Sequence, residues 1–379
     1  MNWNDKTAAN VKAIKPSGIR KFFDIAAQVK GVLSLSIGEP GFAAPDKVLA
    51  AMKASLDAKE TSYTGNSGMM ELREAISHHF EQRYGVHYDP KDEILVTVGV
   101  SEGLAMALLA ITEPGDEVII PDPAYVAYPA SVELAGGTPV FVPTYPEHDF
   151  KLTVEALEKV ITPKTKAIVI GYPNNPTGTV MSAEELMPIA KFAEEHDLIV
   201  LSDEIYCELM YGDAKFTSFA KLPGMRERTV IFNGFSKAYA MTGMRLGYVC
   251  APREGLAPIL KLHQYAIMCA NTTAQVGGIT ALKECDDDVE AMRQEYDRRR
   301  KVIYKGLCDM GLPVFEPKGA FYIFPDIRCT GMTSAEFCEK LVQEEKVAVV
   351  PGTAFGDQGE GFVRISYAAS TSARSNSSC

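Results

Sequence analysis

Short runs of apolar and β-branched residues alternate with longer, helix-like patterns through the middle of the chain. The clearest runs predict strands at 94–98, 117–121, 138–143, 166–171, 198–204, 228–235 and 245–252. Several runs are apolar at consecutive positions, which is typical of strands buried on both faces of a sheet. Helical patterns lie between them at 101–111 and 182–196, and the second opens with Ser182 and Glu185 in capping-box spacing.

This alternation predicts an α/β fold, in which helices cover both faces of a mainly parallel sheet. Such sheets bind ligands at the carboxyl ends of their strands. The C-terminal part differs, because a long charged helix at 289–310 is followed by short strands and a short helix. We therefore predict a large domain over 46–285 and a smaller α+β domain built from 1–45 and 286–379. The first 45 residues have little core of their own, so we expect them to pack on the small domain.

Composition and charge narrow the class of partner. The 379 residues carry a formal net charge of −11, which disfavours nucleic acid and anionic membrane surfaces as partners. The eight cysteines form no CxxC pair, so we expect reduced thiols and no metal site. The N-terminal residues have no apolar signal-peptide core and no apolar run approaches about 18 residues. We therefore expect no signal peptide, no membrane span and a cytoplasmic location.

The segment GFSKAYAMTGMRLGY, residues 234–248, carries the strongest candidate chemistry. A lysine just after a strand is usually a solvated surface residue. Here Ser236 precedes Lys237, and Arg245 follows between two glycines. A lysine used for Schiff-base chemistry needs a sheltered amine with a lowered pKa, which a nearby cation favours. An arginine such as Arg245 can offer two donors to a phosphate.

Four further segments place polar or aromatic residues directly after predicted strands. LIVLSDEIY ends with Asp203 and Tyr206, YPNNPTG contains Asn175, and DPAYVAYP contains Tyr125. In VTVGVSEG a glycine separates the strand from a helix that begins near Ser101, so free N–H groups can bind an anion there. Each segment taken alone also has an ordinary interpretation, as a cap, a turn or core packing.

Together these segments resemble, in order, those of the class I/II aminotransferases, which are fold-type-I pyridoxal-phosphate enzymes. The resemblance covers nearly the whole chain, from about residue 35 to residue 368. It implies a three-layer large domain of fold type I, a smaller α+β domain and pyridoxal 5'-phosphate as cofactor. In this family the counterpart of Lys237 binds the cofactor aldehyde as an internal aldimine, so Lys237 is the expected catalytic residue.

The resemblance also implies the other cofactor contacts. Asp203 would face the ring nitrogen, and Tyr125 would stack on the ring. Tyr206 and Asn175 would contact the ring hydroxyl. The phosphate would be bound by residues of two turns, namely Val100, Ser101, Glu102, Ser236 and Arg245. Glu102 fits beside a dianion only if its carboxylate points away.

Substrate and partner contacts follow from three further matches. Arg364, in GFVRISYA, would pair with the substrate α-carboxylate, beside Asn175 and the backbone of Gly38. Tyr63, in YTGNSG, matches a tyrosine that reaches the cofactor phosphate of a partner chain. This match implies a homodimer with shared active sites, whereas an ordinary loop tyrosine is the alternative. The segment GAFYIFP, residues 319–325, is interpreted as structural.

The implied reaction is a ping-pong transamination between an L-amino acid and a 2-oxo acid such as 2-oxoglutarate. Binding of a dicarboxylate needs a second cation, and none lies near Ser101 in the sequence. We therefore favour aromatic or other neutral amino acids over aspartate, unless Arg20, Lys21 or a partner chain supplies that cation.

Two alternatives stay open at this stage. A C–S β-lyase on the same scaffold would use the same cofactor residues, and would release pyruvate and ammonia. A non-catalytic pyridoxal-phosphate regulator would need an added DNA-binding domain, for which the N-terminal segment is too short. The C-terminus departs from the family, because STSARSNSSC stands where an amphipathic helix is expected.

Overall fold

The computed structural model describes residues 1–14, 18, 22 and 29–369. The candidate cations Arg20 and Lys21 and the Ser-rich end at 370–379 lie outside these described residues. Within the described part, no helix is long and apolar enough to cross a bilayer.

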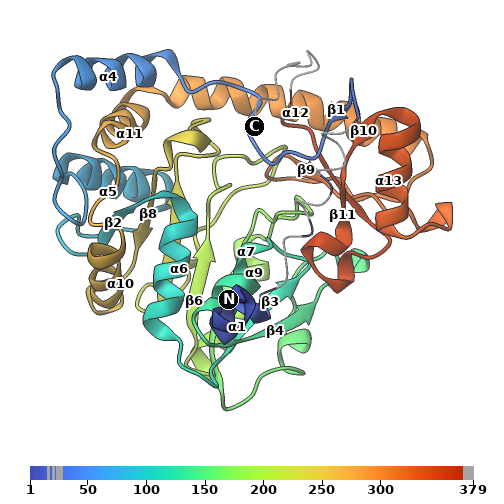
Figure 1. Ribbon diagram of the computed structural model, residues 1–379, viewed down its shortest axis with the longest axis horizontal. Helices are drawn as coiled ribbons and strands as arrows, with labels where there is room; N and C mark the ends of the chain where they lie inside the picture. The colour runs from blue at the N-terminus through green and yellow to red at the C-terminus, as the bar shows by residue number, and fades with distance from the viewer. Residues whose placement is uncertain (15–17, 19–21, 23–28, 370–379) are drawn as a thin grey trace.

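A seven-stranded sheet forms the centre of the molecule (Figure 1). Its strands are β2 (Ile94–Thr97), β3 (Glu117–Asp122), β4 (Thr138–Pro143), β5 (Thr165–Ile170), β6 (Ile199–Asp203), β7 (Thr229–Gly234) and β8 (Gly247–Cys250). The spatial order is β2-β8-β7-β6-β5-β3-β4. All neighbours are parallel except β8, which runs antiparallel to both β7 and β2. The predicted mainly parallel sheet is therefore confirmed, and its strands occupy the seven predicted runs.

Helices cover both faces of this sheet. They are α4 (Asp46–Asp57), α5 (Met70–Tyr84), α6 (Gly99–Ile111), α7 (Ala127–Leu134), α8 (Val154–Leu157), α9 (Ala183–Glu195), α10 (Arg253–Ala266) and α11 (Thr272–Glu284). Side chains that alternate along a strand enter different cores. Leu95 packs with α6, α7 and α10, whereas Ile94 and Val96 pack with α4, α5 and α11. This alternation gives the three layers of the predicted α/β fold.

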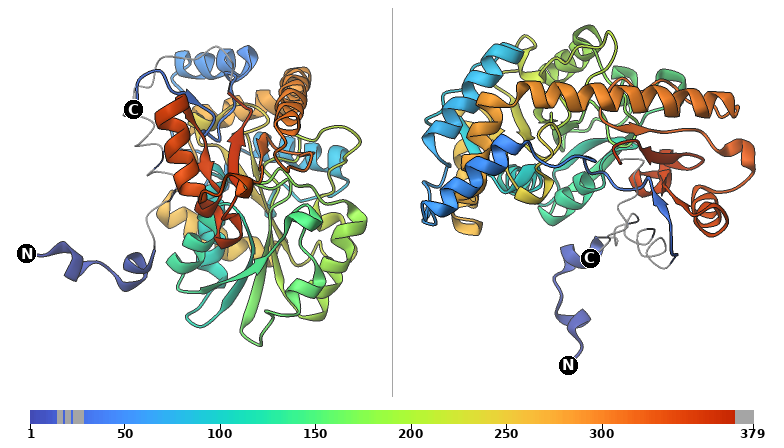
Figure 2. Two further views of the ribbon diagram at one scale, coloured as in Figure 1. Left: turned by 90° about the vertical axis from the view of Figure 1, so that its right-hand side faces the viewer. Right: turned by 90° about the horizontal axis from the view of Figure 1, so that it is seen from above.

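The C-terminal region adds a smaller α+β unit. Its elements are α12 (Asp286–Asp309), β9 (Tyr322–Ile323), α13 (Ser334–Glu345), β10 (Val347–Ala348), β11 (Val350–Pro351) and β12 (Val363–Ser366). The strands β11, β12 and β9 form an antiparallel sheet. The long helix α12 runs along the edge of the molecule from α11 to this sheet (Figure 2). The domain boundaries predicted from the sequence stay a prediction.

The N-terminal segment contacts the rest of the molecule in more than one place. The strand β1 (Leu33–Ser34) pairs in parallel with β10, so this part joins the small unit. Two short helices precede it, α1 (Trp3–Lys6) and α2 (Ala9–Ala13). The helix α2 contacts α7 instead, and Asn10 Nδ2 donates to the carbonyl of Leu134 at 3.2 Å. Figure 2 shows this segment extending away from the body of the molecule.

Candidate active site

A cleft of about 410 Å³ opens at the carboxyl ends of the central strands. The predicted residues that line it are Gly38, Val100, Ser101, Tyr125, Asn175, Asp203, Tyr206, Ser236, Lys237, Arg245 and Arg364. They come from segments more than 300 residues apart in the chain, and the fold brings them to one place. Glu102 and Tyr63 are the predicted residues that do not line this cleft.

Lys237 lies in the turn that follows β7, with its amine inside the cleft. Its Nζ donates to the carbonyl of Gly38 at 2.6 Å and lies 5.7 Å from the ring centres of Tyr206 and Phe321. Burial, followed by the charge of Arg364, lowers the pKa of Lys237 to about 8. A sheltered amine with a lowered pKa is the environment that Schiff-base chemistry at a lysine requires.

Asp203 ends β6 and is almost fully buried. Its Oδ2 accepts from the Tyr128 hydroxyl at 2.7 Å, and its Oδ1 accepts from the Ile205 amide at 3.2 Å. Burial raises the pKa of Asp203, while the hydroxyl and amide donors oppose this rise. Tyr128 was missed in the sequence; it lies in the first turn of α7, three residues after Tyr125, which precedes that helix.

The N-terminus of α6 and the Arg245 guanidinium form a cradle of donors. Gly99 adopts φ +72°, and a Cβ there would lie 2.4 Å from Arg245 Nη2. A Cβ on Gly247 would lie 2.7 Å from the carbonyl carbon of Gly99. Both glycines are thus required for the close approach of these segments. No side chain caps the start of α6, so its first N–H groups stay available to an anion.

The side chain of Glu102 points away from this cradle. One carboxylate oxygen accepts from the Val98 amide at 3.0 Å, and the other lies 3.0 Å from Nδ1 of the fully buried His263. Each oxygen of the Glu102 carboxylate therefore has a polar contact inside the protein. Only the backbone of Glu102 remains for the predicted anion contact.

Arg364 projects from β12 and is 3% exposed. Its Nη1 donates to Asn175 Oδ1 at 2.9 Å, and its Nη2 donates to the carbonyl of Ser36 at 2.6 Å. The guanidinium carbon lies 4.5 Å from the ring centre of Tyr322 and 4.7 Å from that of Phe355. This cation is therefore held between aromatic rings and oxygen acceptors at the floor of the cleft.

Tyr206 and Tyr322 meet in the same cleft, with their hydroxyl oxygens 2.8 Å apart. Tyr322 belongs to the GAFYIFP segment, which the sequence analysis took as structural only. Its spacing from Tyr206 in the chain is 116 residues, so no local pattern could reveal this contact.

Tyr63 lies outside the cleft and is 80% exposed. Its neighbours are fixed, because Thr272 Oγ1 donates to the carbonyl of Ser62 and Gln275 Nε2 donates to Thr64 Oγ1. The residues on either side of Tyr63 are thus bonded to α11, while the aromatic ring faces solvent.

The comparison with known proteins decides the family. The protein-family model described as "Aminotransferase class I and II" matches residues 30–378. The chain belongs to this family. An aspartate aminotransferase of Pyrococcus abyssi is 51% identical, with 94% of this chain and 92% of that protein covered. An aromatic-amino-acid aminotransferase of Thermococcus litoralis is 48% identical, with 94% and 92% covered.

A solved structure agrees with this assignment. The aromatic aminotransferase of Pyrococcus horikoshii superposes with a TM-score of 0.88 at 49% identity, over 92% of this chain and 94% of that one. The protein is therefore an aminotransferase, and the fold-type-I architecture is confirmed. Members of the family depend on pyridoxal 5'-phosphate, which is the cofactor of this enzyme.

The cleft of the aminotransferase fits that cofactor. A buried carboxylate at Asp203 suits a protonated ring nitrogen, and the sheltered Lys237 amine suits an aldehyde. The glycine-lined cradle at Gly99, with Arg245 beside it, suits a phosphate dianion. The donor set is thus complementary to the three chemically distinct parts of the group.

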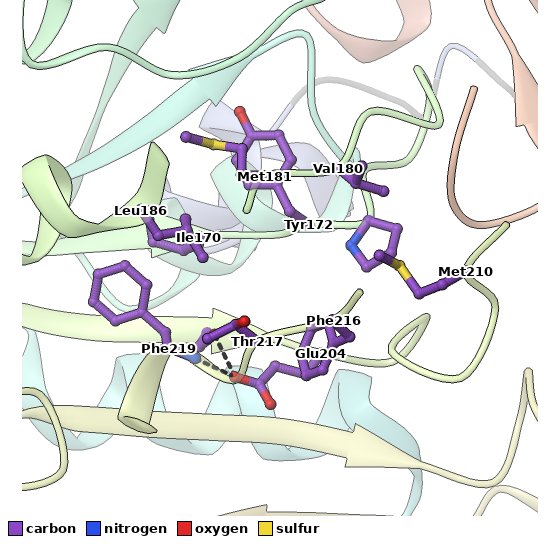
Figure 3. Close-up of a pocket in the computed structure, with 12 residues that line it drawn as sticks. Ile170, Tyr172, Val180, Met181, Leu186, Glu204, Met210, Phe216, Thr217 and Phe219 are labelled. Carbon is purple, nitrogen blue, oxygen red and sulfur yellow. Dashed lines mark hydrogen bonds between the residues drawn. The ribbon is translucent and has the colours of Figure 1, made fainter. Parts of the chain in front are cut away.

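A second buried carboxylate lies directly after the end of β6. Glu204 follows Asp203 and points into a small internal cavity with room for roughly one water molecule (Figure 3). Its Oε1 accepts from the Ser218 hydroxyl at 2.9 Å and from the Phe219 amide at 3.1 Å. Its Oε2 has no partner among the described residues. Burial raises the pKa of Glu204 to about 7.

Proposed function

We propose that this aminotransferase moves the amino group of an L-amino acid with an aromatic or other neutral side chain to a 2-oxo acid such as 2-oxoglutarate. The observation that carries the proposal is the charge inventory of the cleft. Its cations among the described lining residues are Lys237, Arg245 and Arg364. The cofactor and the substrate α-carboxylate would engage all three, and the remaining charge at the mouth, Glu39, is negative. A second carboxylate therefore lacks a dedicated cation within the described part of the chain.

Lys237 is the proposed catalytic residue. Pyridoxal phosphate, when bound, supplies an electron sink for negative charge at the substrate Cα. Lys237 would hold the cofactor aldehyde covalently until the substrate amine replaces it. The freed Nζ would then act as a general base that accepts the proton from the substrate Cα, and as a general acid that donates it to the cofactor. A pKa of about 8 leaves part of the amine neutral near neutral pH, as a base requires.

The surrounding residues would hold and tune the cofactor. Asp203 would keep the ring nitrogen protonated, and Tyr125 would cover the ring face. Tyr206 and Asn175 would donate to the ring hydroxyl. The phosphate would be bound by Ser236, Arg245 and the first-turn groups of Val100, Ser101 and Glu102.

Arg364 would bind the substrate α-carboxylate with its planar fork, with Asn175 and the Gly38 backbone beside it. This pairing would fix one end of the substrate and so aim the Cα–H bond at the Lys237 amine. Orientation of this kind lowers the entropic part of the barrier.

The proposal includes a homodimer in the cytoplasm. The exposed Tyr63 ring on an anchored backbone supports a contact with the partner's cofactor phosphate. Other large apolar side chains are exposed on neighbouring segments, namely Met70, Tyr265 and Met268. The cysteines in the described part of the chain are free thiols, in keeping with a reducing compartment.

The donor preference is tested with a panel of amino acids and 2-oxoglutarate. We expect glutamate and the matching 2-oxo acid to form in equal amounts, with kcat/KM for phenylalanine or tyrosine at least about tenfold above that for aspartate, since an unpaired distal carboxylate costs binding. A preference for aspartate would contradict the substrate assignment. Release of pyruvate and ammonia from a β-substituted amino acid, without glutamate, would contradict transamination.

A further inference from the structure

Tyr322 lines the cleft, where its hydroxyl lies beside that of Tyr206 and its ring lies beside the Arg364 guanidinium. It starts β9 and pairs with Ser366 of β12, so it is two residues removed from the strand position of Arg364. Its side chain is 1% exposed. A Cβ built on Gly38 would lie 2.5 Å from the Tyr322 hydroxyl oxygen. The hydroxyl is thus packed against the backbone of a predicted substrate loop and beside the predicted cofactor residue Tyr206.

Hydrogen bonds of the preceding residues and a ring contact hold Tyr322 in place. The amide of Ala320 donates to the carbonyl of Leu209 at 2.9 Å, and the Tyr211 hydroxyl donates to the carbonyl of Ala320 at 2.5 Å. These bonds tie the segment before β9 to the segment that carries Tyr206. The rings of Tyr206 and Tyr322 pack edge to face, with centres 5.8 Å apart.

The hydrogen bond between the Tyr206 and Tyr322 hydroxyls has only one possible donor if Tyr206 donates its own hydrogen to the cofactor. Each phenol has a single hydrogen, and burial raises the pKa of both tyrosines, so both stay protonated. If Tyr206 gives its hydrogen to the ring oxygen of the cofactor, Tyr322 must donate to Tyr206. The ring of Tyr322 meanwhile faces the Arg364 guanidinium.

We propose that Tyr322 is a positioning residue that directs the Tyr206 hydroxyl hydrogen toward the cofactor and braces Arg364 for the substrate carboxylate. This inference rests on the proposed function and adds a residue to it. One side chain thereby couples the cofactor contact to the substrate contact.

The hydroxyl claim is tested with Tyr322→Phe, which keeps the ring and removes the donor. The readout is the pH midpoint of the visible absorption of the cofactor-loaded enzyme, which reports loss of a proton from the nitrogen that joins Lys237 to the cofactor. Loss of that proton leaves the ring oxygen with uncompensated negative charge, and the Tyr206 donor stabilises this form. We expect the midpoint to rise by about half a unit or more, because the donor is weakened.

Three further variants make the test decisive. Tyr206→Phe should raise the midpoint further, and adding Tyr322→Phe to it should cause no extra shift, since both act through one hydrogen bond. Tyr88→Phe removes an equally buried hydroxyl in the core beside α5, outside the cleft, and should leave the midpoint unchanged. An unmoved midpoint in Tyr322→Phe, or additive shifts in the double variant, would overturn the role of the hydroxyl.

The bracing claim uses binding of 3-phenylpropanoate, a carboxylate without an amino group. We expect Tyr322→Leu to weaken this binding by about fivefold or more through loss of the cation–π contact, and Tyr322→Phe to leave it within about twofold. Equal binding in wild type and Tyr322→Leu would overturn the bracing role. A wild-type protein without a cofactor absorption band would instead refute the proposed function, so the two failures are distinguishable.

Discussion

Arg364 illustrates how single residues in this cleft are prepared for a ligand. A guanidinium with 3% exposure loses most of its hydration, and burial lowers its pKa. The Asn175 and Ser36 oxygens and the two aromatic faces offset part of this cost. Among the described residues Arg364 forms no ion pair, which leaves its charge available to the substrate carboxylate proposed above.

Replacing Arg364 with lysine keeps a charge and removes the planar fork. We expect KM for the amino acid to rise about 30-fold or more, since a bidentate charged pair is worth roughly 2–3 kcal/mol. Steady-state kinetics measure the change. Arg328→Lys is the matched control, because Arg328 pairs with Asp326 and faces the Phe362 ring outside the cleft. An equal effect of both variants, or none for Arg364→Lys, would contradict the carboxylate assignment.

Single site residues could be predicted from the sequence where they belong to a short motif of functional residues. Lys237 and Asp203 stand in short segments at strand ends, and the cleft contains both. Tyr128 and Tyr322 were missed because their partners, Asp203 and Tyr206, lie 75 and 116 residues away. Only the folded chain brings those pairs within hydrogen-bond distance.

At the element scale, two adjacent carboxylates at the carboxyl end of β6 lie in different environments. Asp203 faces the cleft, where a cation is available, whereas Glu204 faces an apolar cavity with one oxygen unpartnered. The two groups are adjacent in sequence, and their environments give them different electrostatic roles.

Glu204 predicts a pH dependence of stability. Its pKa in the folded protein, about 7, lies above the ordinary value of 4.5, so the folded state binds this proton more tightly than the unfolded state. The contribution of Glu204 to the free energy of unfolding is therefore fully present below about pH 4.5 and falls as pH rises to 7, by about 3 kcal/mol in total. Glu204→Gln should remove this component.

The measurement is the thermal unfolding midpoint of both proteins between pH 5 and pH 8. We expect the difference between Glu204→Gln and wild type to grow in favour of the variant as pH increases. A constant difference across this range would show that Glu204 does not titrate there.

Element bounds were predictable where the hydrophobic pattern was regular. The strand β4 spans the predicted 138–143, and the capping box of α9 forms between Ser182 and Glu185 as predicted. The helix α12 begins at Asp286, three residues before the predicted start. Its first turn contains three aspartates, which favour a helix N-terminus through its dipole but leave no apolar signal.

At the scale of the whole molecule, the exposed Tyr63 bears on whether the protein forms a homodimer. Tyr63 is 80% exposed on an anchored loop, and its side chain makes no hydrogen bond or ring contact with the described residues. The dimer proposal gives it a role at the phosphate of the partner's cofactor. The sequence motif predicted this role for Tyr63.

Subunit complementation tests this role. Tyr63→Ala and Lys237→Ala chains, each impaired alone, would be co-expressed with different tags and isolated as mixed dimers. One site of each mixed dimer would then contain the intact Lys237 of one chain and the intact Tyr63 of the other. We expect that site to bind the cofactor about tenfold more tightly than the Tyr63→Ala homodimer.

Cofactor affinity in the mixed dimer equal to that of the Tyr63→Ala homodimer would contradict a shared site. Mixed dimers of wild type and Lys237→Ala provide the control for assembly and tags.

The most direct test of the central claim is the covalent bond between Lys237 and pyridoxal phosphate. Wild type, Lys237→Ala and the surface control Lys318→Ala, whose lysine pairs with Asp213, would be loaded with cofactor, reduced with borohydride, digested and analysed by mass spectrometry, with absorption spectra taken before reduction. We expect a visible absorption band and a reduced cofactor adduct on the peptide containing Lys237 in wild type and Lys318→Ala, and no such adduct in Lys237→Ala. A wild-type protein without the adduct, or with the adduct on another lysine, would contradict the account.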